Sequence, residues 1–324
     1  MTESSQEFQY VSQLLSTDHP NAMAELELLA KKGDPHALMQ MGDFHLAGGK
    51  LKRNFRKAFK YVSEAADAGL IEAKRAEIYL TGRGLGRNAN RKLAQNKLKK
   101  LAETDRFAAV QSQLLEHADS RERLKTIEPE IVSEDPSIKI WRGLFSQAEF
   151  GYLRRIGEPI LRPAMVVNPA TGQGRLDPIR RSDACSFGVS IEDLMIQYIL
   201  GTIAEATGTL PSQGEPLTIL RYPVGGEYRK HYDAYGGDWK GAQRLATALI
   251  WLNDDYEGGE THFPKLDLKL RGNAGDMMVF ANIGDDGMRD DRMQHAGLPV
   301  TQGEKWLASR WITVVDTDTL PSFG

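Results

Sequence analysis

The N-terminal third of the chain contains a repeated sequence pattern. Gly33 recurs as Gly69 and Ala58 recurs as Ala94, so both pairs are offset by 36 residues. A period of this length is typical of repeat architectures, in which each unit is one supersecondary motif that buries its apolar face against the next unit. The pattern predicts an array of stacked units over residues 1–125.

Each unit predicts a pair of helices. In the first unit, helices over residues 37–46 and 57–66 are followed by Gly48-Gly49 and by Gly69, and glycine commonly ends helices. The second unit carries Ile-Tyr-Leu-Thr-Gly-Arg-Gly-Leu at residues 78–85. These features resemble the Sel1-like repeat, an αα-hairpin related to the tetratricopeptide repeat. The resemblance implies an array that docks a protein or peptide substrate on a concave face.

Charge is unevenly distributed along the chain. The formal net charge is −3, which gives no reason to expect nucleic acid or membrane as a partner. Between Lys50 and Lys100, however, fifteen Lys and Arg residues stand against four acidic residues. This basic segment is either a docking face or the solvated side of surface helices, and the sequence leaves both interpretations open.

The pattern changes after the repeats, and a chain of 324 residues is expected to hold two domains. Residues 126–137 are charged and contain two prolines, which predicts a linker. From residue 138 to 324, helices are expected over 146–156 and 191–207. Short β-prone runs follow at 217–222, 246–252, 277–281 and 306–315, separated by glycine-rich turns. We expect an α+β two-domain protein whose second domain is an antiparallel jelly roll with flanking helices.

Cys185 is the only cysteine, which excludes an intrachain disulfide and a cysteine-based zinc site. The N-terminus is acidic and polar and has no secretory pattern, and no run approaches the ~20 apolar residues of a membrane span. We therefore expect a cytoplasmic protein without a membrane partner.

Three residues of the second domain have the types that hold non-haem Fe(II). His231 and Asp233 form a His-x-Asp motif, and His295 follows much later. Two imidazoles and one carboxylate leave three of the six octahedral positions of such a metal open for cosubstrate and dioxygen. The motif alone is common, but Lys305 lies ten residues after His295 and could hold the far carboxylate of 2-oxoglutarate. All four residues that such a site needs are therefore present in the second domain, with the lysine after the second histidine.

The second domain resembles the prolyl 4-hydroxylase branch of the Fe(II)- and 2-oxoglutarate-dependent dioxygenases over about residues 138–316. The matching stretches are residues 220–233, 244–254, 258–264, 275–280 and 295–306, with Trp311 beyond them. The resemblance implies a double-stranded β-helix fold. It also implies Fe(II), 2-oxoglutarate and O2 as cofactors, with ascorbate as a reductant.

The same resemblance assigns individual residues. It implies that His231, Asp233 and His295 bind iron and that Lys305 binds the distal carboxylate of 2-oxoglutarate, as a compact charge with three donors. Tyr222 and Thr261 fall where the family places hydroxyl donors to that carboxylate.

Three further residues, Tyr228, Arg244 and Trp311, fall where peptidyl-proline hydroxylases line the substrate groove. Each also has a plainer interpretation. The two aromatic residues could belong to the barrel core, and Arg244 could be a surface ion-pair partner. His262 is not expected to belong to the site. It follows Thr261, so strand alternation turns its side chain to the opposite face of the strand.

The leading hypothesis is a dioxygenase that hydroxylates a protein or peptide at proline, releasing succinate and CO2, with the repeats docking the substrate. One alternative keeps the chemistry but takes a free amino acid or small metabolite as substrate. The other is an interaction or sensor protein in which the repeats act and the barrel is inactive. The resemblance supports the reaction type more than the substrate, because one fold hosts many targets.

Overall fold

The computed structural model describes residues 5–319, apart from 168–173, 177–178, 238 and 240. The chain divides into two compact units. One comprises the chain up to Glu116 together with Gly188–Gln197, and the other comprises His117–Phe187 and Tyr198–Thr319. The outermost ends of the two predicted domains, residues 1–4 and 320–324, lie outside the described residues.

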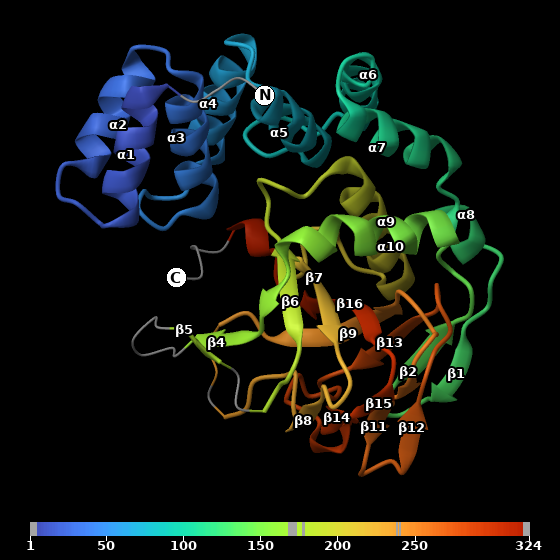
Figure 1. Ribbon diagram of the computed structural model, residues 1–324. Coiled ribbons are helices and arrows are strands. Elements are labelled where there is room, and N and C mark those ends of the chain that lie inside the picture. The colour runs from blue at the N-terminus through green and yellow to red at the C-terminus, as the bar shows by residue number, and fades with distance from the viewer. Residues whose placement is uncertain (1–4, 168–173, 177–178, 238, 240, 320–324) are drawn as a thin grey trace. The chain divides into compact units, whose positions relative to one another are not determined.

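The first unit is a series of antiparallel helices (Figure 1), as the repeat pattern predicts. Both helices predicted for the first repeat are present, and Gly48 and Gly69 end them with φ of 79° and 99°. The helices of this unit are α1 (Gln6–Ser16), α2 (Ala22–Lys31), α3 (Pro35–Ala47), α4 (Phe55–Asp67), α5 (Ile71–Arg83), α6 (Arg91–Leu101) and α7 (Arg106–His117).

Local sequence signals start these helices. Asp34 caps α3 by accepting hydrogen bonds from the amides of His36 and Ala37, and Asn54 caps α4 through the amide of Lys57. Helices α3 and α4 pack closely because Gly42 faces Val62, where an added Cβ would lie 2.8 Å from a Val62 methyl group. The small residues of the repeat therefore set the distance between its helices.

A short segment from the second half of the sequence belongs to the first unit, which the repeat pattern does not predict. Glu192 forms a buried ion pair with Arg83 of α5. The side-chain amide of Gln197 donates to the Tyr79 carbonyl at 2.9 Å, and Leu194 packs against Gly82. Residues 188–197 are thus part of the packing of the last repeats.

The second unit is built on two antiparallel sheets, and the expected jelly roll is confirmed. An eight-stranded sheet has the order β1-β2-β13-β9-β16-β7-β6-β3, and a four-stranded sheet has the order β12-β11-β14-β8. From β7 onward the chain passes repeatedly between these sheets, which is typical of a jelly roll. The strands of the large sheet are β1 (Glu130–Ser133), β2 (Ile138–Trp141), β3 (Arg162–Pro163), β6 (Asp183–Phe187), β7 (Leu217–Tyr222), β9 (Arg244–Trp251), β13 (Met277–Ala281) and β16 (Lys305–Thr313). Those of the small sheet are β8 (Tyr228–His231), β11 (Thr261–Phe263), β12 (Leu268–Leu270) and β14 (His295–Gly297).

Two short strand pairs complete the strands of the structure. They are β4 (Met165–Val167) with β5 (Gly174–Leu176), and β10 (Glu257–Gly258) with β15 (Val300–Gln302). Part of the predicted linker, residues 130–133, forms strand β1, which pairs with β2 at the edge of the large sheet. The expected helix over 146–156 is α9 (Gln147–Gly157), which begins with a capping box between Ser146 and Glu149.

The core of the second unit lies between its two sheets. Phe263 of the small sheet packs in one apolar cluster with residues of the large sheet, among them Trp251 and Phe280. Outside the sheets, α9 lies against β7 and β16, because Gly157 approaches Ile219 of β7 closely and Arg154 lies over Trp306 of β16. The remaining helices are α8 (Ser120–Leu124) and α10 (Leu194–Thr207). Among the described helices, none combines the length and the apolar character needed to cross a membrane.

Candidate active site

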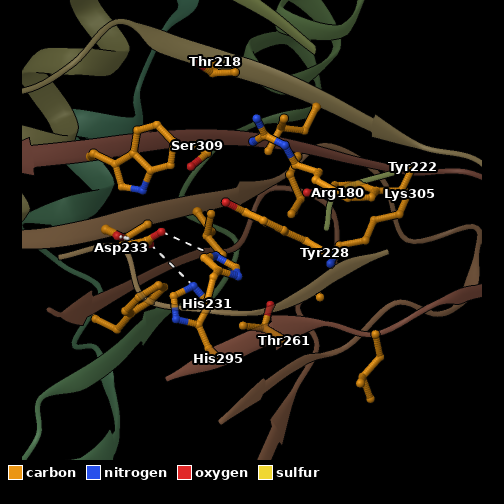
Figure 2. Close-up of a pocket in the computed structure, with 18 residues that line it drawn as sticks. Arg180, Thr218, Tyr222, Tyr228, His231, Asp233, Thr261, His295, Lys305 and Ser309 are labelled. Carbon is orange, nitrogen blue, oxygen red and sulfur yellow. Dashed lines mark hydrogen bonds and ion pairs between the residues drawn. The ribbon is translucent and has the colours of Figure 1, made fainter. Parts of the chain in front are cut away.

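A pocket opens between the two sheets of the second unit. Its empty volume is about 670 Å³, part of it open to solvent. Apolar side chains from the large sheet form much of its wall, including Leu220, Leu249 and Leu307. The predicted residues Tyr222, Tyr228, His231, Asp233, Thr261, His295, Lys305 and Trp311 all line this pocket. Residues that are far apart in the sequence therefore meet at one cavity (Figure 2).

The three predicted iron ligands come together at one side of the pocket. His231 ends β8 and His295 begins β14, and the two residues are direct partners in the antiparallel register. Asp233 follows β8 by two residues and reaches both imidazoles, with 3.5 Å from each Nε2 to a carboxylate oxygen. In the described part of the chain, they form the one group of three His, Cys, Asp or Glu whose ligand atoms lie within 4.8 Å of one another.

Neighbouring groups orient these three side chains. Nδ1 of His231 lies 2.7 Å from the Arg229 carbonyl, and Nδ1 of His295 lies 2.9 Å from the Met293 carbonyl. A backbone carbonyl accepts a hydrogen bond, so each Nδ1 carries the proton and each Nε2 presents a lone pair to the site. Both histidines are therefore held in the tautomer that binds metal through Nε2.

The carboxylate of Asp233 is held in place by two successive hydrogen bonds. The Thr247 hydroxyl donates to Asp233 Oδ2 at 2.6 Å, and the Asn282 side-chain amide donates to Thr247 Oγ1 at 2.9 Å. All three side chains are buried. Thr247 and Asn282 are not among the site residues expected from the sequence, although such supporting groups are typical of metal sites.

The donor groups of the cluster suit a divalent cation. Burial by itself raises the pKa of Asp233, but the two histidines and the Thr247 hydrogen bond outweigh it and lower that pKa below its ordinary value. Burial also lowers the pKa of His295. One carboxylate and two imidazoles are the donor groups that non-haem Fe(II) accepts, so the residues fit that metal.

A buried lysine occupies another part of the pocket wall. Lys305 begins β16 and pairs across the sheet with Tyr222 of β7. Its ammonium group donates to the Gly259 carbonyl and lies 5.8 Å from the centroid of the Tyr222 ring. Burial lowers the pKa of Lys305 to about 7, although Glu260 partly opposes this. Thr261, on β11, is also buried in this wall.

The three predicted groove residues differ in their placement. The Tyr228 ring stacks on His231 with 3.5 Å between centroids, and Trp311 contributes to the wall with an indole N–H that has no hydrogen-bond partner in the described structure. Arg244 is not among the lining residues. Its guanidinium makes a bidentate ion pair with Glu215 and lies 3.5 Å from the centroid of the Trp311 ring.

Other polar residues line the pocket without having been singled out from the sequence. They are Arg180, Thr218 and Ser309 (Figure 2). The Arg180 guanidinium carbon lies 4.9 Å from the centroid of the Tyr228 ring, and Arg180 forms an isolated bridge with that residue. Thr218 and Ser309 pair in register on β7 and β16. Strand alternation could have placed Thr218 on one face with Leu220 and Tyr222, but nothing in the sequence around Arg180 indicates a pocket.

The comparisons with known proteins agree with this geometry. Residues 217–313 match the model of the 2OG-Fe(II) oxygenase superfamily. Prolyl 4-hydroxylase 1 of Arabidopsis thaliana is 33% identical over 208 residues, which cover 59% of this chain and 73% of that protein.

Two solved structures are similar to parts of this chain. A viral collagen prolyl hydroxylase from Paramecium Bursaria Chlorella virus-1, solved as a 2OG complex, is 26% identical, with a TM-score of 0.46 and coverage of 55% of this chain and 96% of that chain. A Sel1 repeat protein from Oxalobacter formigenes is 24% identical, with a TM-score of 0.31 and coverage of 33% and 85% respectively.

Three observations identify the family of this chain. They are the predicted ligand cluster, the presence of Lys305 in the same pocket, and the relationship to the plant enzyme. The chain belongs to the prolyl 4-hydroxylase family and is a dioxygenase that depends on Fe(II) and 2-oxoglutarate.

Proposed function

We propose that this enzyme hydroxylates proline in a protein or peptide. The observation that carries the proposal is that the His231, Asp233 and His295 cluster and Lys305 line the same pocket. Bound together, Fe(II) and 2-oxoglutarate activate O2, so that one oxygen atom enters a C–H bond of the substrate and the other enters succinate as CO2 leaves. The residues of the chain hold the metal, bind the cosubstrate and position the substrate.

In this proposal His231, Asp233 and His295 hold the iron, and Thr247 keeps the carboxylate in place. Lys305 binds the distal carboxylate of 2-oxoglutarate. Its ammonium has three N–H groups and donates one to Gly259, which leaves two for a carboxylate. The hydroxyls of Tyr222 and Thr261, in the same wall, add further donors. Because this part of the pocket is buried, the charge-assisted hydrogen bonds are stronger than in water.

The rest of the pocket suits a peptide. The indole N–H of Trp311, which has no hydrogen-bond partner among the described residues, would donate to a peptide carbonyl, and the Tyr228 ring would pack against a substrate ring. Arg244 then supports Trp311 from behind as a positioning residue. Prolyl 4-hydroxylase 1 is named for action on proline, which favours proline over another amino acid. A free amino acid or small metabolite remains the alternative substrate.

The first test is mass spectrometry of a cell extract treated with Fe(II), 2-oxoglutarate and either the wild-type protein or the His231→Ala variant. We expect a proline that gains one oxygen atom with the wild type only. Succinate release that requires added small metabolites, with no oxidised protein, would favour the alternative substrate. No turnover with either protein would favour the hypothesis of an inactive barrel, which the family relationship opposes.

We further propose that the repeats dock the protein substrate through their basic residues. Deletion of the repeats is a poor test, because residues 188–197 pack within the repeat unit. A charge reversal on the exposed side of α6, Lys92→Glu with Lys100→Glu, leaves the packing intact. It should slow hydroxylation of the protein substrate but not of a short peptide. The matched control is Lys265→Glu with Lys269→Glu, two exposed lysines near β12.

The proposed location is the cytoplasm. The one cysteine, Cys185, is buried on β6, and burial raises the pKa of its thiol to about 11. A thiol with such a pKa is unreactive, and a chain with one cysteine needs no oxidising compartment for folding. Fractionation of cells that express the tagged protein would check the location.

A further inference from the structure

Two stretches of the repeat unit contain many basic residues and no acidic ones. Residues 50–60 include six Lys and Arg residues, residues 84–100 include another six, and neither stretch contains Asp or Glu. Like charges this close in the sequence repel one another unless acidic partners from other parts of the fold neutralise them. The ion pairs of the repeat unit therefore decide whether these stretches form a charged surface.

Part of this charge is neutralised within the described structure. Four lysines form ion pairs with acidic residues of the repeat unit, namely Lys50, Lys60, Lys97 and Lys99. Five other basic residues are exposed, and their side chains form no ion pair or hydrogen bond with any described residue. They are Lys52, Arg56, Lys57, Arg87 and Lys92, which we call the basic patch. Their charges are available to a partner.

The two stretches meet at the start of α4. The loop between α5 and α6 lies against this helix, because an added Cβ on Gly86 would come within 2.7 Å of the Cβ of Phe59. Arg87 follows Gly86, and its guanidinium carbon lies 5.4 Å from the centroid of the Phe59 ring. Arg56 precedes Phe59 by three residues, so the two side chains lie on the same face of the helix. Basic residues of two successive repeats therefore share one surface.

The repeat places further charge at an equivalent position. Asn54 and Asn90 are 36 residues apart and cap α4 and α6, each accepting a hydrogen bond from an amide of its own helix. Arg56 and Lys92 follow these caps by two residues, so they occupy the same position in the two helices. Helix α5 packs against both α4 and α6. Packed helices have axes about 8–10 Å apart, so the axes of α4 and α6 lie at most about 20 Å apart, which is the reach of about six residues of extended chain.

The side chains of the patch suit carboxylates better than nucleic acid bases. The Phe59 ring holds the Arg87 guanidinium by its face and leaves the N–H groups at its edge for an acceptor. A guanidinium edge matches a carboxylate with two parallel hydrogen bonds, and the lysines add compact charges. Proteins that bind single-stranded nucleic acid also use exposed aromatic rings on which the bases stack. Among the described residues between Leu28 and Phe107, no large apolar side chain is exposed.

We propose that the basic patch binds an acidic, extended segment of the protein substrate. This inference rests on the proposed function, because it names the chemistry by which the repeats dock the substrate. Arginine clusters are a recurring means of binding acidic motifs. A segment rich in Asp and Glu has little apolar surface to bury and is commonly disordered, so it can follow the patch from α4 to α6.

The patch is tested by fluorescence anisotropy with a labelled octapeptide in which Glu alternates with Ser. The peptide contains no proline, and no metal or 2-oxoglutarate is added. Arg56→Glu with Lys92→Glu should lower the affinity about 10-fold, because two attractions become repulsions. This double variant should stay folded, since both positions are exposed and glutamate in the first turn suits a helix N-terminus.

The matched control is Lys265→Glu with Lys269→Glu, which changes the net charge by the same amount at two exposed positions outside the repeats. In about 0.15 M salt, charges more than about 8 Å from the peptide are largely screened, so the control should shift the affinity by less than about two-fold.

The proposal fails if the octapeptide does not bind, or if the wild type and Arg56→Glu with Lys92→Glu bind it equally. It also fails if a peptide with Gln in place of Glu binds equally well, or if an oligouridylate of equal charge binds more tightly, which would point to nucleic acid. Because the assay needs neither iron nor proline, its result is independent of proline hydroxylation. A loss of affinity in the double variant, together with no oxidised proline in the treated cell extract, keeps the patch and removes the proposed function.

Discussion

His231 and His295 are direct partners across the antiparallel strands β8 and β14, with ring centroids 4.3 Å apart. Strand pairing therefore aligns two of the three metal ligands before any metal binds. Side chains alternate along a strand, so a shift of register by one residue would turn one imidazole away from the other. The geometry of the iron site is a property of the sheet.

Replacing His231 by alanine should reduce Fe(II) affinity by at least about 100-fold and abolish 2-oxoglutarate turnover, because two ligands are too few to hold the metal. The fold should remain, since His231 lies at a strand end and the apolar core does not include it. Anaerobic equilibrium dialysis with Fe(II) and a thermal melt check this. His262→Ala is the control, because His262 lies on β11 but does not line the pocket. Turnover that survives in His231→Ala contradicts the site.

Thr247→Val should weaken iron binding by about 10-fold or more, because the valine keeps the shape but removes the hydroxyl that donates to Asp233. Thr247→Ser keeps a hydroxyl, so its Fe(II) affinity should stay within about three-fold of that of the wild type. The measurement is a competitive titration of Fe(II) against a chelator. Equal affinities for the valine and serine variants would show that the hydrogen bond does not hold the carboxylate.

Lys305→Met should raise the KM for 2-oxoglutarate by about 10- to 100-fold, since it removes a charge-assisted hydrogen bond of roughly 1.5–3 kcal/mol. Iron affinity should be unchanged, because Lys305 is not in the ligand cluster. Succinate formation at varied 2-oxoglutarate, together with the Fe(II) titration, separates the two effects. Lys269→Met, at an exposed position on β12, is the control. A normal KM in Lys305→Met would remove this residue from the cosubstrate site.

The affinity for 2-oxoglutarate should fall as pH rises above about 7. Burial lowers the pKa of Lys305 to about 7 in the free protein, so the ammonium form predominates below this pH and the neutral amine above it. 2-Oxoglutarate is a dianion on both sides of pH 7 and binds the ammonium form. Each pH unit above 7 should therefore weaken binding by up to about 10-fold. Fluorescence titration between pH 6 and 9 checks this, and Lys305→Met should show no inflection near pH 7.

Much of the fold follows from local sequence signals. The strands expected at 217–222 and 277–281 are observed as β7 and β13 with the same bounds, since short β-prone runs separated by turn residues are a local signal. Strand β1 was not predicted, because none of the residues of Glu130–Ser133 is buried and charged residues surround it. A helix over 191–207 was expected, but the packing of residues 188–197 within the repeat unit was not, because their partners, Arg83 among them, come from a distant part of the sequence.

The sequence by itself determined the repeats, the strand rhythm and the residue types of the site, because helix ends, periodicity and ligand chemistry are encoded over short distances. His231, Asp233, His295 and Lys305 could be identified in this way. Only the tertiary structure decided that Thr247 and Asn282 support Asp233, that Arg180 lines the pocket and that Arg244 stands behind Trp311. These relationships depend on which strands pair and how the two sheets face each other, and no local pattern carries that information.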